Sequence, residues 1–150
     1  MIRRVTEAGA EFWVDLAGIH AAGFEHGWNA EALRTMAQAT HSRVYVVDED
    51  GSIVCFILLT VVAGEGEILT IATAPEHRGR GHAARLLAHV ADTLAAEQIE
   101  AIFLEVAVDN MAALALYGRA GFQPAGMRKA YYSRAEGVAA DAAILRLALG

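Results

Sequence analysis

The segment from residue 68 to residue 108 constrains the fold most, because it has the pattern of a strand, a loop, a helix and a second strand. Residues 68–73 and 101–108 are apolar runs of strand length, and residues 81–97 place apolar side chains at helical spacing. Two strands joined through a helix run parallel in one sheet. The sequence therefore predicts at least one parallel strand pair.

The segment before this unit has an antiparallel pattern. Residues 43–47 and 53–63 are strand-like runs separated by Asp-Glu-Asp-Gly, which is typical of a hairpin turn. We also interpret Glu65 and Gly66 as a turn. Further upstream, the sequence predicts a short strand over residues 2–6 and two helices over residues 11–20 and 30–39, the second of them capped by Asn29.

The segment after the parallel unit completes the fold. Asn110 begins and Gly121 ends a predicted helix over residues 110–120, and residues 122–127 and 142–149 predict two last strands. The order of elements indicates an α/β fold, with a mixed sheet of about six to seven strands and helices on both faces. A chain of 150 residues suits one domain, so we assign residues 1–150 to a single domain.

Composition excludes several classes of protein. The net charge of −6 argues against general nucleic-acid binding, which needs a basic surface. The single cysteine, Cys55, excludes an internal disulfide and lies in an apolar strand, so we interpret it as a core residue and not a nucleophile. No apolar stretch resembles a membrane span or a signal peptide. We expect a cytoplasmic monomer without membrane contact.

A positively charged, glycine-rich corner, Arg78-Gly79-Arg80-Gly81, stands where the predicted helix begins. The free N–H groups and the dipole of a helix start favour an anion, and glycines allow a ligand to approach the backbone closely. The corner therefore predicts a phosphate-binding site. A solvated loop with two incidental arginines is the alternative.

Two common phosphate motifs fit this corner less well. The Walker motif fails because no lysine followed by serine or threonine closes it. Gly79, Gly81 and Ala84 fit the dinucleotide pattern, and Glu105 lies about twenty residues on, where a ribose-binding acid belongs. However, the corner follows antiparallel strands, and too few residues remain after it for a doubly wound sheet. Dinucleotide binding stays as an alternative.

A third pattern covers more of the chain. Residues 78–83, Arg-Gly-Arg-Gly-His-Ala, resemble the acetyl-CoA pyrophosphate loop of the GCN5-related N-acetyltransferases, the GNAT superfamily. The segment ILTIATAPEHRGRGHAARLL resembles the whole strand, loop and helix around that loop. The segment FLEVAVDNMAALALYGRAGFQPAGMRKAYYSRAEG resembles one branch of the superfamily, the bacterial ribosomal-protein-alanine N-acetyltransferases of the RimI group.

The resemblance implies how acetyl-CoA would bind. In such enzymes it lies in a V-shaped opening where two parallel strands splay apart, which here are residues 68–73 and 103–108. The backbone of Ile71, Ala72 and Thr73 would pair with the pantetheine arm. The residues implied at the pyrophosphate form the phosphate loop, residues 78–84: Arg78, Gly79, Arg80, Gly81, His82, Ala83 and Ala84. Asn110 would contact the cofactor, with a helix cap as its alternative role.

The resemblance also implies catalytic residues. Glu105 matches the general base, and residues 101–108 have the continuous apolar pattern of a strand buried on both faces. The alternative is a structural carboxylate paired with an arginine. Tyr117 matches the general acid that protonates the CoA thiolate, with a buried core tyrosine as the alternative. Glu67 is a second candidate for the base.

The acceptor is expected to be an amine. An α-amino group loses its proton near pH ~8 and a lysine near pH ~10.4, so a single carboxylate activates the first more easily. This favours a protein N-terminus, for example that of a small-subunit ribosomal protein. Trp28, Tyr131 and Tyr132 match residues of the acceptor groove. The alternatives are a small-molecule amine, a lysine side chain, or a regulatory module that binds acyl-CoA without catalysis.

The six histidines show no spacing of metal ligands, so the sequence predicts no metal. His77 and His82 are interpreted as solvated loop residues, although both are placed to reach a phosphate.

Overall fold

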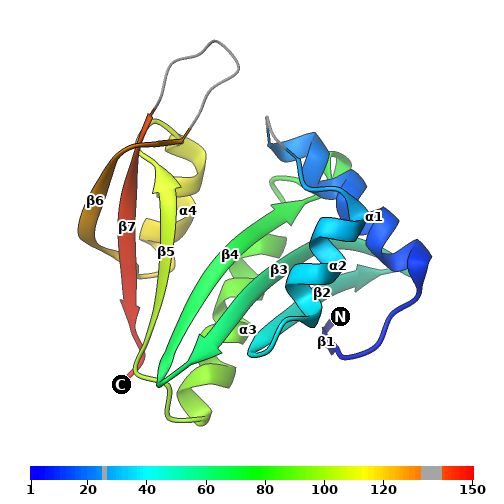
Figure 1. Cartoon of the computed structure of the whole chain (residues 1–150), viewed down its shortest axis with the longest axis horizontal. Helices are drawn as coiled ribbons and strands as arrows, with labels where there is room; N and C mark the ends of the chain where they lie inside the picture. The colour runs from blue at the N-terminus through cyan, green and yellow to red at the C-terminus, as the bar shows by residue number, and fades with distance from the viewer. Residues whose placement is uncertain (25–26, 133–139) are drawn as a thin grey trace.

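The structure, a computed structural model, describes residues 1–24, 27–132 and 140–150 (Figure 1). The strands are β1 (Ile2–Val5), β2 (Ser42–Glu49), β3 (Ser52–Val62), β4 (Glu65–Thr73), β5 (Ala101–Ala107), β6 (Gln123–Tyr132) and β7 (Ala140–Ala148). The helices are α1 (Ala10–Gly23), α2 (Ala30–Gln38), α3 (His82–Ala96) and α4 (Met111–Arg119), with a short 3-10 helix, η1 (Pro75–His77), before α3.

All strands belong to one seven-stranded sheet in the order β1-β2-β3-β4-β5-β7-β6. The pairing of β4 with β5 is parallel, and the other neighbouring strands pair antiparallel. The predicted mixed sheet, its parallel unit and the predicted order of elements are therefore confirmed.

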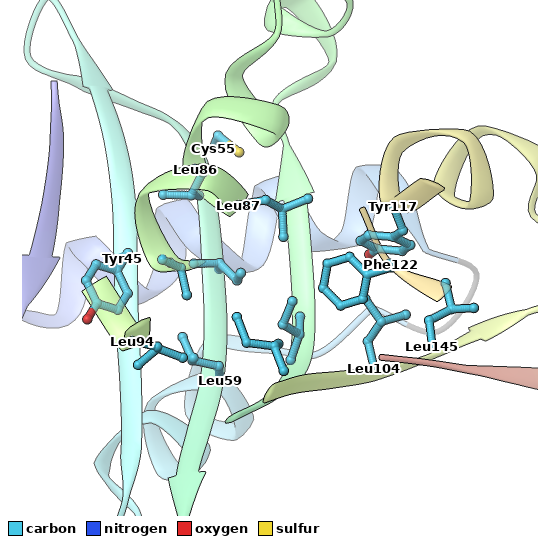
Figure 2. Close-up of a cluster of buried hydrophobic side chains, with 14 of the residues drawn as sticks. Tyr45, Cys55, Leu59, Leu86, Leu87, Leu94, Leu104, Tyr117, Phe122 and Leu145 are labelled. Atoms are coloured by element: carbon cyan, nitrogen blue, oxygen red, sulfur yellow. The ribbon is translucent and has the colours of Figure 1, made fainter. Parts of the chain in front are cut away.

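The helices cover both faces of the sheet, as predicted (Figure 1). Successive residues of a strand point to opposite faces. Val44 and Val46 of β2 accordingly pack in one apolar cluster with side chains of α1 and α2. Tyr45 and Val47 pack in the other cluster, with side chains of α3 and α4; Figure 2 shows this second cluster. Each face of the central strands is therefore buried by its own helix layer.

Strands β4 and β5 separate after a short ladder. The register pairs Glu65 with Ala101 and ends where Ile68 meets Leu104. Beyond this point β5 stays paired with β7, whereas β4 stays paired with β3, so the two strands diverge (Figure 1). The predicted splay is confirmed. Over residues 69–73, the edge of β4 that faces β5 has no strand partner within the described chain.

A bulge marks the start of the divergence. Leu59 pairs with Ile68 while Leu58 pairs with Thr70, which leaves Leu69 as an extra residue on β4. Bulges bend a strand and increase its twist, and they are common next to active sites. The extra residue at Leu69 thus helps to turn β4 away from β5.

The predicted turn at Glu65 and Gly66 is wrong, because both residues begin β4. The turn lies at Ala63 and Gly64, whose φ angles are +52° and +82°. Gly66 serves packing instead: a Cβ atom there would lie 3.0 Å from Cδ1 of Leu94 in α3. The small residue lets the helix approach the strand closely.

The predicted burial of β5 on both faces is also wrong. Ile102, Leu104 and Val106 are buried, but Phe103 and Glu105 between them are partly exposed. The side of β5 that faces away from α3 and α4 is only half covered.

Among the described helices, none is long and apolar enough to span a lipid bilayer.

Candidate active site

The phosphate loop has the backbone geometry that its glycines suggested. Gly79 and Gly81 have φ angles of +76° and +80°, in the left-handed region that favours glycine. Gly81 is the N-cap of α3 and has no side chain that could accept a hydrogen bond from this helix start. The first N–H groups of a helix have no partner within the helix, so those at residues 82–84 suit an anion.

Arg78 is held by carbonyl oxygens on both sides of the loop. Its Nε donates to the Thr73 oxygen at the end of β4 over 3.2 Å, and its Nη2 donates to the Ala22 oxygen in the last turn of α1 over 3.2 Å. The guanidinium therefore ties the end of β4 to the end of α1, and its charge lies where the dipole of α1 is negative.

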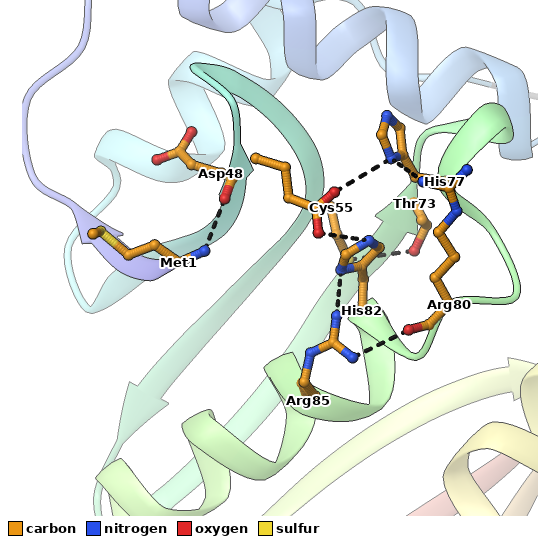
Figure 3. A network of polar contacts seen from close by, with 9 residues as sticks. Met1, Asp48, Cys55, Thr73, His77, Arg80, His82 and Arg85 are labelled. Carbon is orange, nitrogen blue, oxygen red and sulfur yellow. Dashed lines mark hydrogen bonds and ion pairs between the residues drawn. The ribbon is translucent and has the colours of Figure 1, made fainter.

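His82 is not a solvated loop residue, and that interpretation is wrong. Its side chain is 2% exposed and points under the loop (Figure 3). Its Nδ1 lies 2.7 Å from Nη2 of Arg85, and Nη1 of Arg85 donates to the Arg80 carbonyl over 3.1 Å. His77 is partly exposed, with its Nδ1 3.4 Å from Nη1 of Arg80.

Glu49, His77 and His82 form a cluster that the sequence did not predict. Glu49 ends β2, and its carboxylate oxygens lie 3.4 Å from His82 Nε2 and 3.7 Å from His77 Nδ1. One ligand atom of each residue lies within 4.8 Å of the others, a spacing open to a metal ion. No local sequence motif predicts this cluster, because its residues are distant in sequence. The β2–β3 hairpin and the turn between β4 and α3 bring Glu49 close to the two histidines.

The edge of β4 contains Ile71, Ala72 and Thr73, the residues implied at the pantetheine arm. They lie beyond the last pair of the β4–β5 ladder. On the side of β4 that faces β5, no strand among the described residues pairs with their backbone. A row of unpaired backbone groups is what an extended ligand needs. The geometry fits the pantetheine arm of acetyl-CoA.

Cys55 lies on β3, opposite Thr73 across the other edge of β4, and inside the core. It is fully buried, and its Sγ accepts a hydrogen bond from Thr73 Oγ1 over 3.3 Å (Figure 3). Burial raises the pKa of the Cys55 thiol, which disfavours the nucleophilic thiolate. The predicted core role of Cys55 is confirmed.

Glu105 lies on β5 one residue beyond the last pair with β4. Its carboxylate is 25% exposed and both its oxygens contact Nη1 of Arg128, at 2.9 and 3.1 Å. The pairing with an arginine, which the sequence left as the alternative, is therefore present. It holds the carboxylate at the splay in a defined orientation.

Tyr117 lies on the opposite side of β5 from Glu105. The tyrosine is 8% exposed and packs in the same apolar cluster as Leu104, beside the ring of Phe122 (Figure 2). Because Glu105 follows Leu104 along the strand, its side chain points to the other face. The two candidate catalytic residues thus flank the splay from its two sides.

Asn110 and Glu67 have clear structural positions. Asn110 caps α4, since its Oδ1 accepts from the N–H of Ala113 over 3.2 Å. Glu67 is exposed and lies opposite Phe103 within the paired part of β4 and β5. The structure therefore places Glu105, and not Glu67, beyond the point where the strands separate.

Trp28 is anchored by an aromatic stack after α1. The ring of His20 is stacked on the rings of Phe24 and Trp28. The distances between ring centroids are 4.2 Å to Phe24 and 4.7 Å to Trp28. The backbone N–H of Trp28 donates to Nδ1 of His20 over 3.0 Å. Tyr131 and Tyr132 end β6, but their side chains lie outside the described residues.

A cavity of about 610 Å³ lies away from the splay, between α1, the β2–β3 turn and η1. Its lining includes the acids Glu11, Asp15, Asp48 and Glu76. An acidic lining disfavours a phosphate ligand. We therefore keep the candidate active site at the splay and the phosphate loop.

Comparison with known proteins identifies a family and several relatives. The model of the Acetyltransferase (GNAT) family matches residues 13–122. The chain is 33% identical over 103 residues, 69% of each chain, to [Ribosomal protein bS18]-alanine N-acetyltransferase of Escherichia coli K12. It is 38% identical over 84 residues to mycothiol acetyltransferase of Clavibacter michiganensis, 56% of this chain and 28% of that protein.

A solved structure extends the similarity to the whole fold. The crystal structure of the ribosomal-protein-S18-alanine N-acetyltransferase from Escherichia coli superposes with a TM-score of 0.88 at 25% identity, covering 100% of this chain and 95% of that one. Together with the family match, this establishes that the chain belongs to the Acetyltransferase (GNAT) family and is an acetyl-CoA-dependent N-acetyltransferase.

Proposed function

We propose that the protein transfers the acetyl group of acetyl-CoA to the α-amine of a protein N-terminus, of the ribosomal-protein-alanine type. The observation that carries this proposal is the placement of Glu105 and Tyr117 on opposite faces of β5, just where it leaves β4. A base on one face and an acid on the other suit an amine that attacks from one side while a thiolate leaves on the other.

The cosubstrate is positioned by backbone groups in this proposal. The pyrophosphate sits on the N–H groups of the phosphate loop, and the pantetheine arm pairs with Ile71, Ala72 and Thr73. The thioester carbonyl then reaches the splay, where a backbone N–H near Thr73 stabilises its developing negative charge. Support comes from the left-handed Gly79 and Gly81 and from the unpaired edge of β4.

The transfer proceeds by direct attack in a ternary complex. Glu105, acting through water, takes a proton from the amine, and the neutral nitrogen forms a bond to the thioester carbon. The C–S bond then breaks as Tyr117 gives its proton to the CoA sulfur, and the second proton that the bonded nitrogen must lose passes through water to the Tyr117 phenolate. Arg128 orients the Glu105 carboxylate by contacting both its oxygens. Cys55 is buried in the core and takes no part.

The bacterial relatives named for ribosomal protein bS18 alanine support a protein N-terminus as acceptor. The test is a pair of peptides: one begins with a free alanine, and the other has a blocked N-terminus and an internal lysine. Thiol release from acetyl-CoA, with the product located by mass spectrometry, should occur only with the first. Acetylation of the blocked peptide would contradict the proposal.

A small-molecule amine is the second candidate. It is favoured by the similarity to mycothiol acetyltransferase, which is 38% identical to this chain over 84 residues. Turnover of small amines without turnover of any peptide would decide for it.

We further propose that the protein acts in the cytoplasm as a monomer.

A further inference from the structure

We propose that Glu49 is a positioning residue for acetyl-CoA, because it holds the phosphate loop through two histidines, His77 just before the loop and His82 within it. We call Glu49, His77, Arg80, His82 and Arg85 the Glu49 network. The inference rests on the proposed function in one respect, the placement of the pyrophosphate on this loop. Nothing in the catalytic step at the splay involves these residues.

The first arm of the network passes through His82, the residue of the loop with which α3 begins. Glu49 Oε1 lies 3.4 Å from Nε2 of His82, whose Nδ1 lies 2.7 Å from Nη2 of Arg85. Arg85 also donates to the Arg80 carbonyl over 3.1 Å (Figure 3). A carboxylate on β2 is thereby connected to the backbone of the loop, which fixes the direction of the neighbouring N–H groups.

The second arm passes through His77, which precedes the loop. Its Nδ1 lies 3.7 Å from Glu49 Oε2 and 3.4 Å from Nη1 of Arg80 (Figure 3). The same carboxylate therefore reaches both ends of the loop. Because Glu49 lies on a paired strand of the sheet, it provides a rigid base for a loop that contains two left-handed glycines.

Hydrogen-bond chemistry fixes the proton on His82. A guanidinium has donors only, so Nδ1 of His82 must accept from Arg85. In the neutral ring Nε2 then carries the proton and points it at Glu49. Burial lowers the pKa of His82, which keeps the ring neutral near pH 7. At 3.4 Å the Nε2 atom forms no hydrogen bond with the described residues, so Glu49 acts on it mainly by charge.

The same three side chains would also suit a metal ion by their spacing. A metal at Nε2 of His82 would need the lone pair of that nitrogen and would move the proton to Nδ1, against the Arg85 guanidinium. Arg80 likewise lies against Nδ1 of His77. The arginine contacts therefore favour a positioning network over a metal centre.

The inference predicts an effect opposite in sign to simple electrostatics. Removing a negative charge beside a phosphate site should tighten anion binding. If Glu49 positions the loop, Glu49→Gln should instead raise the KM for acetyl-CoA about fivefold, because the charge that attracts both histidines is lost. The kcat at saturating acetyl-CoA should stay unchanged. Glu49→Asp, which keeps the charge but shortens the reach, should raise KM similarly.

The experiment measures thiol release from acetyl-CoA and from S-acetyl-pantetheine, which lacks the pyrophosphate, with the acceptor that the wild type acetylates. The Glu49 variants should lose rate at limiting acetyl-CoA and keep the wild-type rate with S-acetyl-pantetheine. Glu76→Gln is the matched control, since it removes an exposed carboxylate of η1 outside the network and should not raise KM. Circular dichroism checks that each variant is folded.

Three outcomes would overturn the inference: an unchanged or lower KM in Glu49→Gln, an equal loss with both acetyl donors, or stoichiometric Zn²⁺ binding that Glu49→Gln abolishes. A wild-type enzyme that uses S-acetyl-pantetheine as efficiently as acetyl-CoA would overturn the placement of the pyrophosphate on the loop. The proposed function would then fail at its cosubstrate site, a result distinct from failure of the Glu49 network.

Discussion

The buried His20 should make the stability of the protein depend on pH between 7 and 5. Its side chain is 2% exposed, and its ring is stacked between Phe24 and Trp28. Burial lowers the pKa of His20 from 6.5 to about 4. Protonation of the ring would also place a proton on Nδ1, which could then no longer accept the hydrogen bond from the backbone N–H of Trp28. We therefore propose His20→Phe, which keeps an aromatic ring but cannot titrate.

The sign and size of the effect follow from linkage. The pKa of His20 in the folded protein, about 4, lies below the unfolded value of 6.5, so the unfolded chain binds more protons between these values. The stabilisation is complete above pH 6.5 and is lost as the pH falls through 4. The full shift corresponds to about 3 kcal/mol, of which about 2 kcal/mol is lost between pH 7 and pH 5.

The assay is urea unfolding followed by tryptophan fluorescence at pH 7 and pH 5. The free energy of unfolding of the wild type should fall by about 2 kcal/mol more than that of His20→Phe over this range. Other titrating groups contribute equally to both proteins and cancel in the difference. The exposed His41 provides the control, because His41→Asn should follow the wild type. Parallel pH dependences of wild type and His20→Phe would refute the reasoning.

Four further changes test the site and the packing of the fold. Tyr117→Phe should lower kcat about a hundredfold while leaving the Kd for acetyl-CoA unchanged, and wild-type turnover would remove the acid role. Arg78→Ala breaks the contacts of the loop to Thr73 and Ala22 and should raise the KM for acetyl-CoA about tenfold in steady-state kinetics; an unchanged KM would contradict this. Gly66→Ala should destabilise the fold by about 1–3 kcal/mol in urea unfolding, because its Cβ would press on Leu94. Gly118→Ala on α4, where a Cβ meets nothing within 4 Å, should instead stabilise it by about 1 kcal/mol.

The parts of the fold that depend on neighbouring residues could be predicted from the sequence. Asn29 and Asn110 cap α2 and α4 as expected, and Gly121, with a φ angle of +99°, ends the second of these helices. Caps and turns act over a few residues, so their chemistry is visible in a local sequence. The glycine pattern of the phosphate loop was predictable for the same reason.

Features that depend on packing between distant segments were missed or misjudged. Gly66 looked like a turn residue, but its small size serves contact with Leu94 across the sheet and helix layers. His82 looked like a loop residue, but it is buried beneath the loop against Glu49 of β2. The sequence leaves open that Glu105 pairs with an arginine, and the order of the strands in the sheet is needed to identify that arginine as Arg128 of β6.

The short ladder between β4 and β5 has a mechanical consequence. The sheet consists of two parts, β1 to β4 and β5 to β7, whose strands pair with each other only over residues 65–68 and 101–104 in the described chain. An acetyl-CoA molecule that bridges β4 and β5 would take the place of the strand pairing that is absent where the two strands have separated. Cosubstrate binding should therefore stiffen the joint between the parts, and amides of β4 beyond Ile68 should exchange hydrogen more slowly once it is bound.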